Sequence, residues 1–223
     1  EKAKNMNAKL NNQGEYLNGK RISSKGYDDS GKLIFILEKN GKGKEFYDND
    51  KIQFEGEYKN GLRWNGKGYD YEGREEFEIE NGTGFGKEYY SNGQIKYEGE
   101  YLNGKRNGKG ISYRKYKEWG DWCSYLDFKG EFLDGKRWKG KGTEYDFYKS
   151  SLLLLEGEYL KGKRSGKGKE YENHGDVISE GEYLNGKRNG FGKEYSHGIL
   201  KSEEEYLNGE KNGKEKFNKK YYL

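Results

Sequence analysis

The chain has 223 residues, of which 30% are hydrophobic, and its mean hydropathy is -1.37. This composition excludes one large conventional core, and the longest apolar run, Leu152 to Leu155, is far shorter than the ~18 residues of a membrane-spanning helix. The 43 basic and 39 acidic residues are interleaved, which excludes a basic arm for nucleic acid, while 22 Tyr, 10 Phe and 4 Trp exclude a disordered chain.

The sequence divides into a lead or capping segment, a repeat array and a tail, over residues 1–13, 14–217 and 218–223. A Gly-Glu-aromatic start marks six clear copies of the repeat, at Gly14, Gly56, Gly99, Gly130, Gly157 and Gly181. Two shortened copies are recognised from residues 41–46 and 84–89, and a last copy begins at Glu204, where glycine is expected. We therefore count nine units, and repeats of 20 to 50 residues are typical of a solenoid rather than a single-core domain.

Each unit is predicted to contain two antiparallel strands, because its residue types alternate with a period of two. In the unit that begins at Glu180, this alternation places Gly181 and Tyr183 on one face of the sheet. Glu180 and Glu182 then lie on the other face.

The register of this hairpin is predicted by assuming a loop over residues 185–190. Tyr183 then lies opposite Gly192, and Glu182 lies opposite Lys193. An aromatic ring over a cross-strand glycine stabilises a sheet, and a pair of opposite charges adds roughly 0.2–1 kcal/mol. The same register in the preceding unit pairs Tyr159 with Gly168 and Glu158 with Lys169.

The connections between units are predicted to be tight turns at Asn92-Gly93, His174-Gly175 and His197-Gly198. Asn-Gly favours a type I′ turn, and histidine tolerates the left-handed conformation. This turn role is favoured for both histidines because no residue has zinc-ligand spacing to them. The chain is thus predicted to be all-β, an elongated single-layer antiparallel meander, twisted and curled, that rises about 10 Å per hairpin to about 90 Å.

Residues 111–127 form an irregular insertion, which we expect to be a longer hairpin or a protruding loop. It contains Cys123, the single cysteine, which excludes an intramolecular disulfide and is compatible with a reducing compartment. We expect Cys123 to be a small apolar or surface residue rather than a nucleophile. A cytoplasmic protein is expected, and the first residue, Glu1, leaves a removed signal peptide as an open alternative.

The segment Tyr97 to Gly110, which reads Tyr-Glu-Gly-Glu-Tyr-Leu-Asn-Gly-Lys-Arg-Asn-Gly-Lys-Gly, closely resembles the MORN repeat (membrane occupation and recognition nexus). Similar segments begin at Phe54, Phe128, Leu155 and Ser179. Proteins with such repeats include junctophilins, radial spoke head components, parasite cytoskeletal scaffolds and plant phosphatidylinositol phosphate kinases. The resemblance implies a structural or recognition surface, with an association with the cytoskeleton or with membranes.

Two stretches, residues 61–68 and 135–142, imitate a phosphate-binding loop. Both carry glycine where that loop needs Ser or Thr to bind magnesium, and both lie in a predicted hairpin rather than between a strand and a helix. We therefore expect no nucleotide, no other cofactor and no metal. No catalytic residue is assigned, and the protein is expected not to be an enzyme.

The loop tips form a first candidate surface, because successive Lys-Arg pairs are predicted to project from one edge of the sheet about 10 Å apart. Basic residues beside tryptophan suit anionic lipid headgroups or an acidic protein surface. The alternative is a row of solvated turns, with the tryptophans folded back on the sheet. This candidate edge consists of Arg63, Trp64, Lys105, Arg106, Arg137, Trp138, Lys163, Arg164, Lys187 and Arg188.

The aromatic face of the sheet is a second candidate surface for protein partners. A single-layer sheet cannot bury such a face without curvature, a partner or a second sheet. The alternative is that the curled sheet covers its own aromatic residues. The face consists of Tyr58, Tyr101, Phe132, Tyr159, Tyr183 and Tyr206.

These features favour a non-enzymatic scaffold or adaptor that binds protein partners, other copies of itself included, through the aromatic face or the open sheet ends. The alternative is a peripheral membrane module that binds anionic phospholipid through the basic edge. A third class, an accessory region of a larger enzyme, stays open because the family attaches such repeats to kinases and methyltransferases. Nucleic acid is not expected as a partner.

Overall fold

The computed structural model describes residues 12–17, 20–28, 30–118, 121–145, 153–172, 175–213 and 216–217. Within these residues the chain is all-β, and no helix of a length and apolarity that could cross a membrane is found. The strands are β1 (Asn12–Leu17), β2 (Lys20–Tyr27), β3 (Leu33–Leu37), β4 (Lys42–Phe46), β5 (Ile52–Lys59), β6 (Leu62–Tyr69), β7 (Glu75–Ile79), β8 (Gly84–Tyr89), β9 (Ile95–Leu102), β10 (Lys105–Glu118), β11 (Asp121–Leu133), β12 (Lys136–Tyr145), β13 (Leu153–Leu160), β14 (Lys163–Tyr171), β15 (Val177–Leu184), β16 (Lys187–Ser196), β17 (Ile199–Leu207), β18 (Glu210–Lys211) and β19 (Lys216–Phe217).

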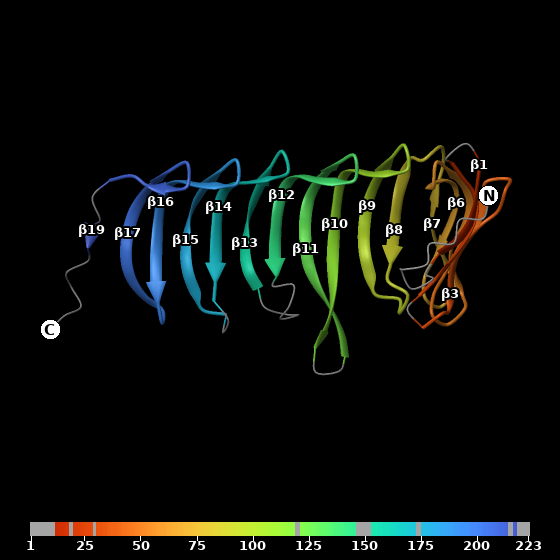
Figure 1. Cartoon of the computed structure of the whole chain (residues 1–223), viewed down its shortest axis with the longest axis horizontal. Helices are drawn as coiled ribbons and strands as arrows, with labels where there is room; N and C mark the ends of the chain where they lie inside the picture. Colours follow the sequence, from red (N-terminus) through yellow and green to blue (C-terminus); the bar gives the residue numbers. More distant parts are fainter. Residues whose placement is uncertain are drawn as a thin grey trace. The chain divides into compact units, whose positions relative to one another are not determined.

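The chain forms two compact units, Glu1–Gly110 and Ile111–Leu223, with the boundary inside β10. In the first unit, β1 to β7 form one sheet in chain order, and β8 pairs instead with β9. In the second unit, the strands from β10 to β18 follow in chain order, and β19 pairs with β17 (Figure 1). Strands β1 to β18 follow as nine successive two-strand segments, one for each unit counted in the sequence, although β7 and β8 of the fourth segment belong to different sheets. The predicted all-β antiparallel meander is confirmed, and its length stays a prediction.

The hairpin tips are two-residue turns that Asn-Gly closes. At the tip between β15 and β16, Asn185 and Gly186 both have positive φ, 52° and 88°. Positive φ at both positions defines a type I′ turn, whose twist matches that of the strands, and Asn and Gly tolerate it best. The same pair of signs recurs at Asn60-Gly61, Asn103-Gly104, Asp134-Gly135, Lys161-Gly162 and Asn208-Gly209.

The connections between hairpins are more varied than the sequence predicts. His197 and Gly198 have φ of 50° and 74°, so the predicted tight turn is confirmed there. At the predicted Asn92-Gly93 turn only Gly93 has positive φ, 81°, and a longer loop is closed by the Tyr90 N–H, which donates to the Gln94 carbonyl at 2.9 Å. The predicted turn residue His174 lies outside the described residues.

The predicted register of the hairpins is wrong. Gly181 lies opposite Gly192, and Tyr183 lies opposite Arg188 rather than Gly192. The reason is that Asn185-Gly186 forms the whole turn, so the strands pair up to the tip and the extra residues go into a β-bulge between Gly181 and Tyr183. The preceding hairpin shows the same correction, with the pairs Gly157–Gly168, Tyr159–Arg164 and Glu156–Lys169 in place of Tyr159–Gly168 and Glu158–Lys169.

The aromatic rings nevertheless cover glycines, but on the hairpin before their own. A Cβ atom added to Gly168 would lie 3.0 Å from Cε2 of Tyr183. In the same way, a Cβ atom on Gly192 would lie 3.1 Å from Cε2 of Tyr206. Glycine is therefore required at these positions because the ring of one hairpin packs directly on the backbone of the previous hairpin, which joins successive units.

The core runs along the same face as these rings. Its largest fully buried side chains are Tyr47, Tyr97, Phe54, Phe128 and Ile79. One buried core position lies two residues before the glycine of the first strand of a hairpin, or before Glu204 in β17. It holds Phe128 in β11, Leu155 in β13, Ser179 in β15 and Ser202 in β17. The core of the second unit therefore becomes smaller from β11 to β17.

The insertion forms the expected longer hairpin, from β10 with 14 residues and β11 with 13. Cys123 is a free cysteine in β11 with partial exposure. The stretches that imitate phosphate loops form parts of β6 and β12, so neither lies between a strand and a helix.

Candidate functional site: a glycine-floored groove

A repeated polar contact joins four of the hairpins to the one before, and we call it the tyrosine–carboxylate–arginine ladder. The Tyr183 hydroxyl donates to Oε1 of Glu170 at 2.6 Å, and Nη2 of Arg188 donates to Oε2 of the same carboxylate at 2.6 Å. Three further carboxylates, Glu45, Glu88 and Glu144, are held in the same way by the pairs Tyr58–Arg63, Tyr101–Arg106 and Tyr159–Arg164. In the β11–β12 hairpin, Arg137 forms an ion pair with Asp127 of the same hairpin.

The contacts of the ladder keep Glu88 charged and Tyr183 neutral. Burial opposes the ionisation of Glu88, but the hydrogen bond and the charge of Arg106 outweigh it and lower the pKa of Glu88 to about 2. Burial and the hydrogen bond to Glu170 raise the pKa of Tyr183 to about 12. No proton moves on these groups near neutral pH, so the ladder is structural.

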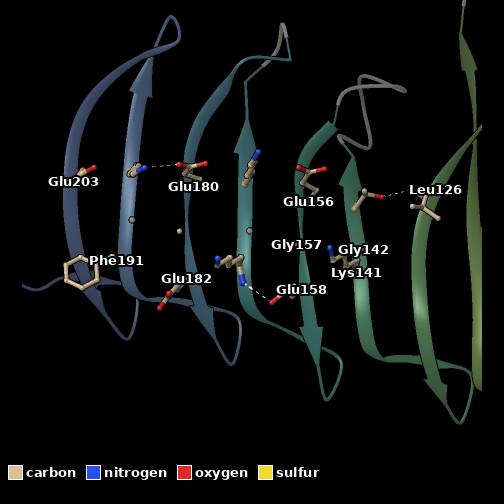
Figure 2. Close-up of a pocket in the computed structure, with 17 residues that line it drawn as sticks. Leu126, Lys141, Gly142, Glu156, Gly157, Glu158, Glu180, Glu182, Phe191 and Glu203 are labelled. Carbon is tan, nitrogen blue, oxygen red and sulfur yellow. Dashed lines mark hydrogen bonds and ion pairs between the residues drawn. The ribbon is translucent and has the colours of Figure 1, made fainter. Parts of the chain in front are cut away.

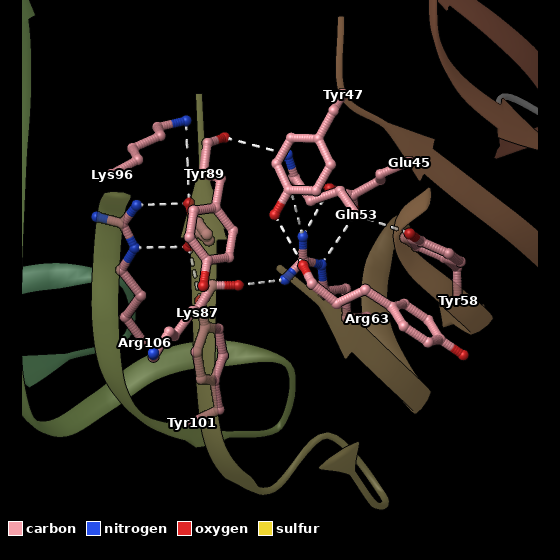
Figure 3. A network of polar contacts seen from close by, with 12 residues as sticks. Glu45, Tyr47, Gln53, Tyr58, Arg63, Lys87, Tyr89, Lys96, Tyr101 and Arg106 are labelled. Atoms are coloured by element: carbon pink, nitrogen blue, oxygen red, sulfur yellow. Dashed lines mark hydrogen bonds and ion pairs between the residues drawn. The ribbon is translucent and has the colours of Figure 1, made fainter. Parts of the chain in front are cut away.

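One member of the ladder also joins the two sheets of the first unit. Arg63 has a side chain that is only 10% exposed, and its Nε and Nη2 donate to Glu45 at 2.9 and 2.7 Å. Its Nη1 donates to the carbonyl of Lys87 on β8 at 2.7 Å (Figure 3). The nearby Gln53 amide donates to the Tyr89 carbonyl at 3.5 Å. These two side chains thus donate hydrogen bonds to two backbone carbonyls on the edge of β8 that β7 leaves unpaired.

The structure places the predicted aromatic face in the core. Tyr58 is partly exposed, and the other five rings, Tyr101, Phe132, Tyr159, Tyr183 and Tyr206, are 3% to 7% exposed. Neighbouring hairpins cover these rings, which is the alternative that the sequence also allowed. Partner binding through them stays a prediction.

The predicted basic edge is divided between two environments. Its five arginines, Arg63, Arg106, Arg137, Arg164 and Arg188, turn inward to the ladder. Trp64 and Trp138 are partly exposed, and Nζ of Lys59 lies 4.0 Å from the centre of the Trp64 ring. Its three lysines, Lys105, Lys163 and Lys187, remain exposed, as does Lys136 at the tip between β11 and β12.

The tips carrying these lysines follow one another closely in the second unit. The Gly186 N–H donates to the Arg164 carbonyl at 2.8 Å, and the Gly209 N–H donates to the Arg188 carbonyl at 2.8 Å. Each exposed lysine lies opposite an exposed leucine across its hairpin. We call this surface the turn edge, and it consists of Leu133, Lys136, Leu160, Lys163, Leu184 and Lys187.

A groove of about 720 Å³ crosses β11 to β17 of the second unit, on the face of the sheet opposite the buried aromatic rings (Figure 2). Its floor is a row of glycines that pair from strand to strand, Gly142, Gly157, Gly168, Gly181 and Gly192. Because the missing Cβ atoms of Gly142, Gly168 and Gly192 would point toward tyrosine rings in the core, the groove side of the row is bare backbone.

Two charged rows flank the glycine floor. The first charged row alternates in sign across neighbouring strands and consists of Glu156, Lys169, Glu180, Lys193 and Glu203. The second charged row consists of Lys141, Glu158, Lys167, Glu182, Phe191 and Glu205. Contacts within the first row are modest, with Nζ of Lys193 3.5 Å from Oε1 of Glu180, and tyrosine hydroxyls hold Glu156 and Glu180 from the side. Phe191 interrupts the second row, and it is 67% exposed.

The sequence reasoning missed this groove. The signal that could have found it is the Gly-Lys-Gly-Lys or Gly-Phe-Gly-Lys run in successive units, which places bare backbone between long polar side chains. The groove can receive an elongated ligand that runs across the strands, and its side chains can form ion pairs with either sign of charge. Among the described residues, no three His, Cys, Asp or Glu side chains are grouped to hold a metal ion.

Comparison with known proteins places these hairpins in a family. The family model of the MORN repeat matches four segments, residues 54–68, 97–114, 156–175 and 180–197. No curated protein matches the chain. The matched segments begin in β5, β9, β13 and β15, so each covers one hairpin with its Asn-Gly or Lys-Gly tip. The repeated hairpin, its glycines and its tyrosine therefore identify the chain as a MORN-repeat protein.

Proposed function

We propose that this protein is a non-enzymatic scaffold or adaptor that holds a segment of a partner protein in the glycine-floored groove. MORN repeats support a repeat-based binding module. The observation that carries the proposal is the row of five glycine positions that face the core, because the groove side of this row has no side chains over five successive strands. An open floor between charged rows suits a ligand that brings its own side chains.

The size of the floor fits a short segment of protein. Five strands at about 4.8 Å per gap span roughly 19 Å. An extended segment of about six residues or a helix of about thirteen residues has this length. The exposed ring of Phe191 offers an apolar contact at one end, and the aliphatic stems of Lys141, Lys167 and Lys169 offer others along the floor.

Charge reversal inside the groove tests this function. Lys169→Glu combined with Lys193→Glu makes the first charged row wholly acidic without touching the core. In a quantitative pull-down from native extract, we expect the partners of the wild-type chain to be lost from this variant. The control is Lys163→Glu with Lys187→Glu on the turn edge, which should keep the same partners. Equal retention by both variants would contradict the groove as the binding site.

A second candidate function is binding to an anionic membrane through the turn edge. The observation that favours it is the pairing of an exposed leucine with an exposed lysine at three successive tips, Leu133–Lys136, Leu160–Lys163 and Leu184–Lys187. No ion pair is formed by these lysines among the described residues. Apolar side chains can enter the headgroup region while each lysine contributes on the order of 1 kcal/mol.

Liposome flotation separates the two candidates. If the turn edge binds lipid, Lys163→Glu with Lys187→Glu should abolish flotation with anionic vesicles, while the two changes in the groove should leave it intact. Binding should also weaken as salt is added. Failure of the wild-type chain to float at low salt would leave the groove as the single candidate.

A further inference from the structure

The second charged row contains one position where its alternation fails. Lys167 stands between Glu158 and Glu182 in this row, and the next position of the same kind, in β16, holds Phe191. Its neighbours in the row are Glu182 on β15 and Glu205 on β17, and Glu205 lies directly opposite Phe191. The row thus has an exposed aromatic ring between two carboxylates where the repeat has a lysine.

The two carboxylates lack the positive charge that the repeat would supply. Neither Glu182 nor Glu205 forms an ion pair within the described part of the chain, and both are exposed. Among the charged side chains that line the groove, five are glutamates and four are lysines, although the whole chain has a net charge of +4. The groove is therefore slightly acidic in a basic protein, and Glu205, beside the groove, adds a further carboxylate next to Phe191.

We infer that Phe191, Glu182 and Glu205 form a subsite for an arginine or lysine side chain of the bound segment. The inference rests on the groove being the binding site. A cation over the face of an aromatic ring is attracted by the ring's quadrupole, and carboxylates on either side neutralise it. A ligand cation at this place restores the alternation that Phe191 interrupts. Figure 2 shows Phe191 and Glu182 at the same end of the groove, where such a side chain enters from the open side.

The chain offers a matched control for this subsite. Phe85 in β8 occupies the same position of the repeat, is 53% exposed and lies opposite Glu100. It belongs to the first unit and lines no part of this groove. Phe191→Lys and Phe85→Lys each install the residue that other units carry, such as Lys167, so both variants should fold.

The experiment is selection of phage-displayed random peptides on the full-length chain and on both variants. We expect the wild-type chain and Phe85→Lys to enrich peptides with arginine or lysine at one fixed position, and Phe191→Lys not to enrich that residue. For the best peptide, Phe191→Lys should weaken binding about tenfold and Phe191→Leu less, as expected for loss of a cation–π contact. Replacing the basic residue of the peptide by glutamine should weaken binding to the wild-type chain and leave binding to Phe191→Lys almost unchanged.

The outcomes separate this subsite from the proposed function. Two results would overturn the subsite but not the groove as the binding site. In the first, the selected peptides compete with one another but share no basic residue. In the second, they bind Phe191→Lys as tightly as the wild-type chain. Selection of no peptide by any of the three proteins would overturn both. Thermal unfolding of the two variants at the temperature of the wild-type chain confirms that the comparison is between folded proteins.

Discussion

Nη1 of Arg63 donates a 2.7 Å hydrogen bond to the carbonyl of Lys87, on the edge of β8 that β7 leaves unpaired. The same guanidinium binds Glu45 through two other nitrogens, so one side chain satisfies both a carboxylate and a strand edge. In the first unit, this contact replaces the backbone ladder that joins neighbouring strands elsewhere.

Arg63→Ala should therefore destabilise the protein more than the same change at another arginine of the ladder. Removing Arg63, whose side chain is only 10% exposed, leaves Glu45 with the Tyr58 hydroxyl but without a positive charge, and leaves the Lys87 carbonyl without this donor. Breaking a buried ion pair costs about 3–5 kcal/mol. Arg164→Ala, at a side chain that is 31% exposed, should lower the free energy of unfolding by about 1 kcal/mol. Urea unfolding measures both variants, and equal midpoints would show that Arg63 does not join the two sheets.

Replacing Tyr183 by Ala should destabilise by roughly 2–4 kcal/mol, because its ring packs on Gly168 and its hydroxyl donates to Glu170. Tyr183→Phe keeps the ring and should lose about 1.5–3 kcal/mol, the contribution of a hydrogen bond to a charged group. Lys187→Ala, at an exposed tip, should change stability by less than about 0.5 kcal/mol. Urea midpoints should follow this order, and a Tyr183→Ala midpoint like that of Lys187→Ala would contradict the burial of the ring.

Gly168→Ala should be destabilising by about 1–3 kcal/mol, because the new methyl group would lie 3.0 Å from the Tyr183 ring. In the Tyr183→Ala background the same change should cost much less, since the ring that it meets is gone. A double-mutant cycle measured by urea unfolding gives the coupling between the two positions. Additive effects would mean that the ring does not rest on this glycine.

Acid should weaken the fold through the ladder carboxylates. The pKa of Glu88 is about 2, below its ordinary value of 4.5. A carboxyl group with a lowered pKa stabilises the folded state above about pH 4.5, and this contribution is lost as the pH falls toward 2. Glu88→Gln should therefore flatten the fall in the urea midpoint over this range, whereas Glu210→Gln at an exposed tip should not. An unchanged slope in Glu88→Gln would contradict the pairing with Arg106.

The fold could be predicted from the sequence because each strand alternates in type and each tip carries a residue pair that accepts positive φ. The register could not, since Asn185-Gly186 reads equally well as a complete turn or as the start of a longer loop. The β-bulge between Gly181 and Tyr183 then shifts every pair beyond it. A bulge of this kind leaves no mark in the alternation of residue types.

The sequence did not predict that the arginines turn inward to the ladder, for a different reason. Lys-Arg at a tip suggests two exposed cations, but Arg188 and Arg106 each reach a glutamate 18 residues earlier, on the previous hairpin. The same separation of 18 residues recurs between Glu45 and Arg63 and was visible in the sequence, but the contact follows only once the hairpins are stacked. The groove was missed because its floor is made of residues without side chains.

The smaller core residues in the later hairpins of the second unit predict the order in which its hairpins unfold locally. Phe128, Leu155, Ser179 and Ser202 occupy the same buried position in β11, β13, β15 and β17, so the last two hairpins bury less apolar surface at this position than the first two. In a repeat array, local stability follows these neighbour contacts, and amide protons of β15 to β17 should exchange with solvent faster than those of β11 to β13. Phe191, in β16, lies in these less stable hairpins. A segment bound there would slow exchange chiefly in the last hairpins, because it would contact their strands from the groove side, opposite the buried serines.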